Sequence, residues 1–516
     1  MIYSYHIFYF PFKWEIMGLE NQAFSDQVNL DNIQYNRNSH WERSQKPDPG
    51  EEESLYNEKN YYYTFVHNIL YDEEHSPLNL IHHFERKEPK LSNHIYYYIK
   101  KKGRNNPYKL IVDAMNINLY ATGVGFLSFY LKNEDCTQNS PEDILAINQY
   151  GRRIMPPFFN DTRLRNEISE YIRIEGLNQT VYFEDFKSYT PYDSWQPSSS
   201  IKKLICELVT NLSIDPIIDD RMFVATWYKN NQLSQQFTNN AKAYFDSQDP
   251  FSDYWYRFLF IDGSNATCQN EKMKKELLEE HTYYRWQQWS SLYGISKYSL
   301  VYLTNNEVPD YLIEYFQTIY ARMAELVLVQ RASMLRFSGE ITKVSQLSNQ
   351  DVEAVSKRVS SLYKEYIRFV NQIYFREITA QDQGIEMYNK LHSCLQMESY
   401  IKDLDGEIEE LHQYISLMED RERNKKASLL NDIATLFLPI TVITGFWGMN
   451  QISEVMEENG ELSTSFIIQS LLLIIGTLCA ICIIYKRKRN FLKTTLRIKK
   501  IPINCKYMSR IKKYLF

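Results

Sequence analysis

The feature that most limits how this chain can fold is a pair of long apolar runs near its C-terminal end. The first, residues 429–447, has about 19 residues, or roughly 28 Å of helix, which is close to the thickness of a bilayer's hydrocarbon core. The second, residues 465–485, has about 21 residues and no charge. We predict a transmembrane hairpin: a first helix over 429–450, a loop over 451–464 and a second helix over 465–485.

The charges around the two runs predict the orientation of this hairpin. Basic residues precede the first run and follow the second, whereas the loop has neither Lys nor Arg: Arg421, Arg423, Lys425 and Lys426 on one side, and Lys486 to Arg489 on the other. Positive charge stays on the cytoplasmic side, so both termini should be cytoplasmic and the loop external. Residues 486–516 would form a basic cytoplasmic tail facing anionic membrane lipid.

The predicted external loop is acidic. It carries Glu454, Glu457, Glu458 and Glu461. Such a cluster attracts cations, more strongly when several copies surround one axis. A plainer interpretation is that any short external loop must be polar, and the loop alone leaves both open.

The first run carries a stripe of small, hydroxylated or apolar residues. Counted back from Gly448 at about 100° per residue, the stripe fills an arc of roughly 80° and contains Ala427, Leu430, Ala434, Leu438, Thr441 and Gly445. Around an axis, such stripes would line a narrow pore that rings of Leu430 and Leu438 could close by dewetting. Ordinary packing between membrane helices also favours small residues.

The end of the first run carries a family resemblance. It closes on Gly448-Met449-Asn450, with Pro439, Thr441 and Gly445 before it and the acidic loop after it. In this arrangement the sequence resembles the two-transmembrane CorA-type magnesium channels, over roughly residues 370–490. Departures, such as Trp447 where the family most often has Tyr, concern metal choice more than the fold.

The resemblance implies a channel for passive influx of Mg²⁺, with cobalt or nickel as further ions, built as a homo-oligomer that is pentameric in the family. It implies a selectivity filter of Gly448, Met449 and Asn450, with Asn450 holding the hydrated ion, and it adds Asn424 to the pore-lining stripe. It also implies a cytoplasmic site that senses a regulatory divalent metal. Mg²⁺ releases its water reluctantly, so neutral oxygens suit a hydrated ion. A potential of 100 mV supplies about 4.6 kcal/mol for a divalent cation.

Composition bounds the remaining interpretations. The chain has 516 residues, a net charge of −6 and a mean hydropathy of −0.47, so most of it should be soluble, and nothing in this balance indicates nucleic acid. The seven cysteines are scattered, which is typical of reduced thiols in a cytosolic compartment. We find no phosphate loop, nucleophile elbow or metal-ligand pair, so we expect neither an enzyme nor a cofactor.

The lack of a presequence favours a bacterial plasma membrane.

The first 308 residues divide into two predicted parts. Residues 1–60 are expected to be a poorly ordered segment and linker, and Met17 could be the true start. Residues 61–308 should form a cytoplasmic α/β domain. Aromatic and β-branched runs predict strands at 61–71, 108–120, 125–131, 221–228 and 298–305, and helices are expected from Ser140-Pro141, over 198–212 and over 271–280. Gly123 to Phe126 is interpreted as a strand kink.

Residues 309–428 should form a stalk of long helices. We predict helices over 310–346 and 350–375, and a third from about 379 through the first apolar run. Within the third, apolar residues at steps of three and four predict a coiled-coil seam: Ile401, Leu404, Ile408, Leu411, Ile415 and Met418. Its acidic residues from Asp403 to Glu410 are interpreted as a solvated face, and we nominate no sensor residues. The fold class is therefore α+β.

Two other functions compete with a magnesium channel. A zinc or other divalent transporter of the same family would use the same architecture. A membrane-anchored coiled-coil scaffold would use the hairpin only as a tether, and it should tolerate replacement of the Gly448-Met449-Asn450 tripeptide.

Overall fold

The computed structural model describes most of the chain as far as Gly448 and isolated positions beyond it. The described residues are 2–20, 22–44, 58–72, 78–87, 95–152, 168–176, 179–186, 199–219, 221–239, 245, 250–263, 265–309, 311–345, 352–448, 468, 471–472, 474–476, 478–479, 482–483 and 486. The chain forms two compact units, Met1–Ile415 (unit 1) and Ser416–Phe516 (unit 2).

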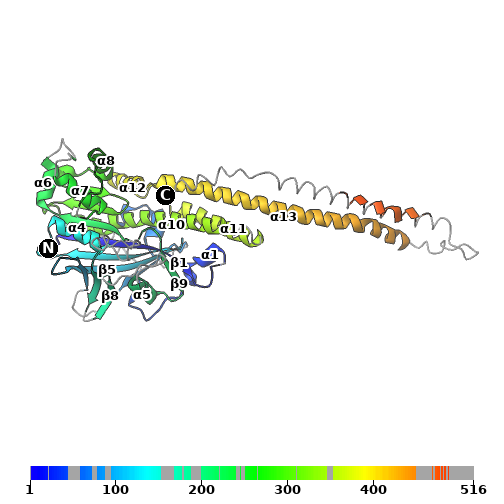
Figure 1. Ribbon diagram of the computed structural model, residues 1–516, viewed down its shortest axis with the longest axis horizontal. Coiled ribbons are helices and arrows are strands. Elements are labelled where there is room, and N and C mark those ends of the chain that lie inside the picture. The colour runs from blue at the N-terminus through cyan, green and yellow to red at the C-terminus, as the bar shows by residue number, and fades with distance from the viewer. Residues whose placement is uncertain are drawn as a thin grey trace, which may run out of the picture. The chain divides into compact units, whose positions relative to one another are not determined.

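Unit 1 combines one mixed sheet with several helices, which confirms the α+β class (Figure 1). The strands are β1 (Ser4–Ile16), β2 (Trp41–Arg43), β3 (Ile81–Arg86), β4 (Tyr96–Lys100), β5 (Tyr108–Tyr120), β6 (Val124–Asn133), β7 (Tyr171–Gly176), β8 (Gln179–Asp185), β9 (Leu212–Pro216), β10 (Phe223–Lys229), β11 (Thr282–Tyr283), β12 (Leu292–Ile295) and β13 (Ser299–Thr304). The helices are α1 (Phe24–Gln27), α3 (His67–Leu70), α4 (Pro141–Gly151), α5 (Ser199–Leu208), α6 (Asn231–Asn239), α7 (Pro250–Phe260), α8 (Glu271–His281), α9 (Tyr311–Tyr315), α10 (Ala321–Ser345), α11 (Val352–Gln372), α12 (Asp382–Cys394) and α13 (Met397–Gly448), the last of which continues into unit 2.

The sheet is built outward from β1. The strand order is β11-β12-β13-β10-β1-β6-β5-β4-β7-β8, in which β1 is antiparallel to both β10 and β6, and β10 is parallel to β13. Every side chain from Ser4 to Phe12 is buried, because both faces of this strand are covered. The expectation that residues 1–60 are a poorly ordered segment is therefore wrong for the described residues 4–43, and residues before Met17 supply the central strand.

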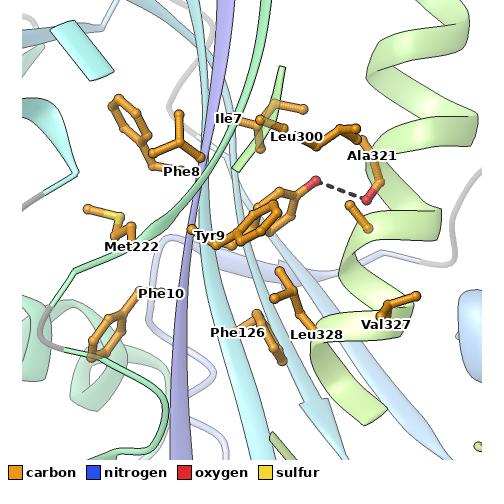
Figure 2. Close-up of a cluster of buried hydrophobic side chains, with 14 of the residues drawn as sticks. Ile7, Phe8, Tyr9, Phe10, Phe126, Met222, Leu300, Ala321, Val327 and Leu328 are labelled. Atoms are coloured by element: carbon orange, nitrogen blue, oxygen red, sulfur yellow. Dashed lines mark hydrogen bonds between the residues drawn. The ribbon is translucent and has the colours of Figure 1, made fainter. Parts of the chain in front are cut away.

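The helix α10 covers one face of this central strand. Its residues contact β1 and β6, and all of its residues from Met323 to Gln330 are buried. Figure 2 shows Tyr9 pointing toward α10, where its hydroxyl donates a hydrogen bond of 3.0 Å to the carbonyl of Ala321, while Phe8 and Phe10 point to the other side of β1. Because α10 completes the core of the sheet, no boundary between compact units falls at the predicted position, 308/309.

The turn between β5 and β6 contains Gly123, which has φ of +76°. Its amide donates a 2.9 Å hydrogen bond to the carbonyl of Tyr120, and a Cβ placed on it would lie 2.5 Å from Val28. A left-handed residue in so tight a turn favours glycine. The predicted strand kink at 123–126 is thus a hairpin turn followed by the start of β6.

One predicted strand, 61–71, is wrong. The segment forms short helical turns that include α3, and Tyr62, Val66, Ile69 and Leu70, which are among its buried residues, follow a spacing of three and four. The Tyr62 hydroxyl donates a 2.5 Å hydrogen bond to the carbonyl of Ile319. Aromatic residues are enriched in strands, but here their burial against helices decides the conformation.

The other predicted elements of unit 1 are largely confirmed, with changed ends. The strands β5, β6, β10 and β13 and the helices α4 and α8 lie where they were predicted, and Ser140 caps α4 as expected. The helix predicted over 198–212 ends at Leu208, and Leu212 begins β9. The helix predicted over 310–346 is divided into α9, a π-helical turn over Phe316–Tyr320 and α10.

The third predicted long helix is two helices. The break lies between Cys394, the last residue of α12, and Met397, the first of α13. Gln396 in this break has φ of +56°, a left-handed conformation that a continuous helix cannot contain. The prediction of one helix from about 379 is therefore wrong. The sequence does not signal the break, because neither a proline nor a glycine lies there.

Candidate functional site

The residues predicted to line a pore all lie on α13, one continuous helix from Met397 to Gly448. At 1.5 Å per residue its 52 residues extend about 78 Å. Residues 397–438 contain no proline, and Gly406 is their one glycine. Pro439 lies inside the helix, so the carbonyl of Thr435 receives no hydrogen bond from an amide at 439.

The predicted pore stripe is uncovered. Asn424, Leu430, Ala434, Leu438, Thr441 and Gly445 are all exposed. Leu430 and Leu438 are 66% and 63% exposed, which is high for leucine side chains in the middle of a helix. At about 100° per residue, the six positions lie within roughly 120° of one another around the helix. The structure thus places them on one face, and that face has no covering partner among the described residues.

Thr441 is the hydroxyl-bearing residue of this stripe. Its Oγ1 donates to the backbone carbonyls of Phe437 and Leu438, at 2.9 Å and 3.1 Å. Thr435 makes a similar bond, at 2.6 Å, to the carbonyl of Asn431. Hydroxyls that donate into the helix let these polar residues sit within an apolar run. Since its proton is directed at the backbone, Thr441 can present only an oxygen acceptor to a hydrated cation.

Charged pairs flank Asn424, the stripe residue nearest the N-terminus of α13. Arg423 lies 3.3 Å from Glu419 and Lys426 lies 3.6 Å from Glu422, each one helical turn apart. All four side chains are at least one third exposed, so each pair contributes a few tenths of a kcal/mol. They balance charge locally and leave the amide of Asn424 as the neutral polar group among them.

Several predicted site residues lie outside the described residues. These are Met449 and Asn450 of the filter and the whole loop, with Glu454, Glu457, Glu458 and Glu461. Gly448, the first filter residue, is the last residue of α13. In the second predicted span the described positions are helical and exposed, for example Leu472 and Ile483 at 65% and 62%. Among the described residues, no helix combines the length and apolarity needed to cross a membrane.

The first half of α13 packs within unit 1. Leu404, Ile408 and Ile415 of the predicted seam are buried, and Ile401 and Leu411 are partly buried. Ile415 and Leu411 join a cluster with Val344 of α10 and with Val355 and Val359 of α11. The spacing therefore predicts the buried face correctly. The partners of Ile415 and Leu411 are helices of the same chain. A coiled coil between copies stays a prediction.

The acidic residues beside the seam are exposed, as the solvated-face interpretation expects: Asp403, Asp405, Glu407, Glu409 and Glu410. Asp405 accepts a hydrogen bond from the Tyr366 hydroxyl of α11. Partial burial and the nearby carboxylates of Asp403 and Glu410 raise the pKa of Glu407. No group of three or more His, Cys, Asp or Glu that could hold a metal occurs within the described ranges.

The start of α13 carries a contact that the sequence does not signal. Gln396, in its left-handed conformation, accepts a 3.1 Å hydrogen bond at Oε1 from the Nζ of Lys297, next to β13. Left-handed residues that end helices are usually Gly or Asn, so a glutamine gives no warning of the break. The contact ties the α12–α13 junction to the turn between β12 and β13.

The chain combines a sheet domain with a long helix that carries an uncovered stripe of polar and apolar residues. Residues 296–488 match the family model described as CorA-like Mg2+ transporter protein, and the CorA-type resemblance is thereby confirmed for this segment, which is less than half of the chain. The match spans β13 to the end of the second apolar run. No curated protein matches the chain.

The members of this family share a general function. Its members are membrane-located transporters of divalent cations such as Mg²⁺, act as oligomers and are not enzymes. The sheet from β1 to β12 lies outside the matched segment. What this chain shares with the family is therefore its helical part and the runs that follow.

Proposed function

We propose that this chain is the subunit of a homo-oligomeric channel, pentameric as in the family, through which hydrated Mg²⁺ flows passively into the cytoplasm. The observation that carries the proposal is the family match over residues 296–488, which contains both apolar runs and the Gly448-Met449-Asn450 tripeptide. The uncovered stripe on α13 supports it, because an exposed face of leucines requires a covering partner from outside the described chain.

In the proposed channel, copies of α13 surround one axis with their stripes facing inward. Rings of Leu430 and Leu438 then form apolar constrictions that close by dewetting. Thr441 supplies a ring of hydroxyl oxygens between these constrictions and the filter. At the mouth, a ring of Asn450 amides holds Mg²⁺ through its water shell, since stripping that shell is costly.

The membrane arrangement follows the two apolar runs. Residues 429–450 and 465–485 form the hairpin, with both termini in the cytoplasm and the acidic loop outside, where four glutamates from each copy concentrate cations. A potential of 100 mV, negative inside, supplies about 4.6 kcal/mol for a divalent ion, so no coupled energy source is needed.

The first test is removal of the Asn450 amide. Full-length protein is reconstituted into liposomes that contain a fluorescent magnesium reporter, and an inside-negative potential is imposed. Asn450→Ala should reduce Mg²⁺ influx at least tenfold, because the ring of side-chain amide oxygens that holds the hydrated ion at the mouth is lost. The control is Asn371→Ala, an exposed asparagine of α11, which should transport like the wild type. Wild-type influx in Asn450→Ala would contradict the filter and favour the membrane-anchored scaffold.

A matched threonine pair on α13 tests the pore face. Thr441 and Thr435 both donate their hydroxyls into the helix, yet they lie about 120° apart around it. Thr441→Val should lower Mg²⁺ influx several-fold, whereas Thr435→Val, at the rim of the stripe about 20° beyond Asn424, should have a clearly smaller effect. Equal effects would rule out the proposed inward face. The same liposomes, with reporters for zinc, cobalt and nickel, establish the ion preference.

A further inference from the structure

A cavity of about 180 Å³ lies in unit 1 where β1, β10, β13 and α10 meet. The polar side chains that line it are Asp219, Arg221, Lys297, Tyr298 and Arg331. Met222 and Phe223 close its apolar side. A water molecule occupies about 30 Å³ in the liquid, so this space is larger than one bridging water needs.

Positive charge dominates the cavity. Arg221 pairs with Asp219 through a 2.8 Å contact, which accounts for the one carboxylate in the lining. Lys297 contacts the neutral amide of Gln396 at 3.1 Å. Among the described residues, neither Lys297 nor Arg331 forms an ion pair with a carboxylate within 4.0 Å. The lining therefore holds two cations in excess of its acids.

Arg331 is the residue that most requires a ligand. Its Nε and Nη1 are buried and have no hydrogen-bond partner within the described part of the chain. Buried polar groups are nearly always hydrogen-bonded, and an unpaired buried charge is especially costly. Burial lowers the pKa of Arg331, since it disfavours the charged form. A guanidinium nevertheless remains protonated in proteins, so an anion is the group that would satisfy it.

The surroundings select the chemistry of that anion. A planar guanidinium matches the oxygens of phosphate, to which it can donate two parallel hydrogen bonds. Tyr298 presents an aromatic ring beside the cations, with the guanidinium of Arg221 at 5.2 Å from its centre and that of Arg152 at 5.6 Å. Arg331 also lines a second cavity, together with Asp403 and Glu407. The carboxylates of these two residues repel anions. An anion should therefore occupy the Tyr298 side.

We propose that this cavity binds a small phosphate-bearing anion, with Arg331 and Lys297 as its principal partners. Lys297 already contacts Gln396 in the break before α13, so a bound phosphate competes for the ammonium that ties this junction to the sheet. The site therefore places a soluble ligand one side chain, that of Lys297, away from the break that precedes α13. This inference is independent of ion conduction, because it concerns binding to unit 1.

The test is calorimetric titration of the full-length protein in detergent, without Mg²⁺, at low ionic strength. Inorganic phosphate is the first probe and adenosine monophosphate the second. The wild type should bind at least one of them, and Arg331→Gln and Lys297→Gln should each weaken binding at least tenfold, as expected for the loss of a charge-assisted hydrogen bond. The control is Lys272→Gln on α8, whose side chain is 87% exposed and which should bind like the wild type.

The two probes distinguish the source of the phosphate. Tighter binding of the nucleotide than of free phosphate would show that the attached group contributes, whereas equal binding would identify phosphate itself as the ligand. Arg331→Gln should also keep or raise the melting temperature of the wild type, because it removes a buried charge without a partner. Binding of neither probe, binding retained in both variants, or equal weakening in Lys272→Gln would overturn the proposal.

Discussion

The two halves of α13 carry similar apolar spacings but end in different environments. In Met397–Ile415, Leu404, Ile408 and Ile415 are buried within unit 1. In Ser416–Gly448, the described leucines are exposed to solvent, and Leu430 and Leu438 are each more than 60% exposed. Periodic apolar residues therefore identify a face that must be covered, and they do not identify what covers it.

The difference also separates two energetic roles. The first half contributes to the stability of a folded unit through burial, at about 25 cal/mol per Å² of apolar surface. The second half obtains little from its own chain, because its described side chains contact mainly solvent. In the proposed channel, lipid and other copies of the chain supply the stabilisation that this half lacks. This contrast predicts unequal responses to mutations of the same kind.

The largest expected effect is that of a cavity in the first half. Ile408→Ala should lower the free energy of unfolding of unit 1 by about 2–5 kcal/mol, because Ile408 is only 3% exposed and its neighbours cannot fully close the space. The matched variant is Leu429→Ala in the second half, where the side chain is 61% exposed and the expected change is within about 0.5 kcal/mol. Chemical denaturation of the detergent-solubilised chain measures both.

Equal losses of unfolding free energy in Ile408→Ala and Leu429→Ala would contradict the contrast between the two halves of α13. That result would mean that the second half of α13 is packed as tightly as the first in the isolated chain, and the uncovered face would no longer argue for an external partner.

Acid should destabilise unit 1 through its buried histidines. His392 of α12 donates a 2.9 Å hydrogen bond from Nε2 to the amide oxygen Oε1 of Gln330 of α10, and burial lowers the pKa of His392 to about 4, below the ordinary 6.5. Between these values the unfolded state binds more protons, so stability is full above pH 6.5 and falls as the pH drops toward 4. The shift corresponds to roughly 3 kcal/mol. Residues 416–448 contain no histidine, so this effect belongs to the packed unit.

Unfolding free energies at pH 7, 6, 5 and 4.5 measure this dependence. His6, His82 and His83 have pKa values lowered to about 4 by the same burial, so His392→Gln should flatten the slope only in part. His40→Gln, whose side chain is 54% exposed, serves as the comparison. An unchanged slope in His392→Gln would show that His392 is not held neutral by the fold.

The predictability of the fold varied with the kind of signal. Strands such as β5 and β13 and the capped helix α4 were predictable because local patterns and long-range burial agree there. The central strand β1 was missed, since a continuous aromatic run at a chain terminus does not show that both its faces are covered. The break at Gln396 was missed because a left-handed glutamine, held there by surrounding contacts, has no compositional signal.

For the candidate site, the sequence predicts residue spacing better than it predicts partners. Asn424, Leu430 and Thr441 share one face of a continuous helix, as their positions required. The seam residue Ile415 packs against α10 and α11, a choice that depends on the full three-dimensional arrangement of unit 1. The filter residue Asn450 lies outside the described residues and stays a prediction.

The smallest expected effect concerns the charged pairs of the second half. Glu422→Gln removes the partner of Lys426, 3.6 Å away, and both side chains are substantially exposed. It should change the free energy of unfolding by at most about 0.5 kcal/mol, and the difference should vanish at 1 M salt, where the screening length is about 3 Å. Chemical denaturation at low and high salt measures it. A cost close to that of Ile408→Ala would mean that charges within the helix, rather than an external partner, hold the second half of α13 in place.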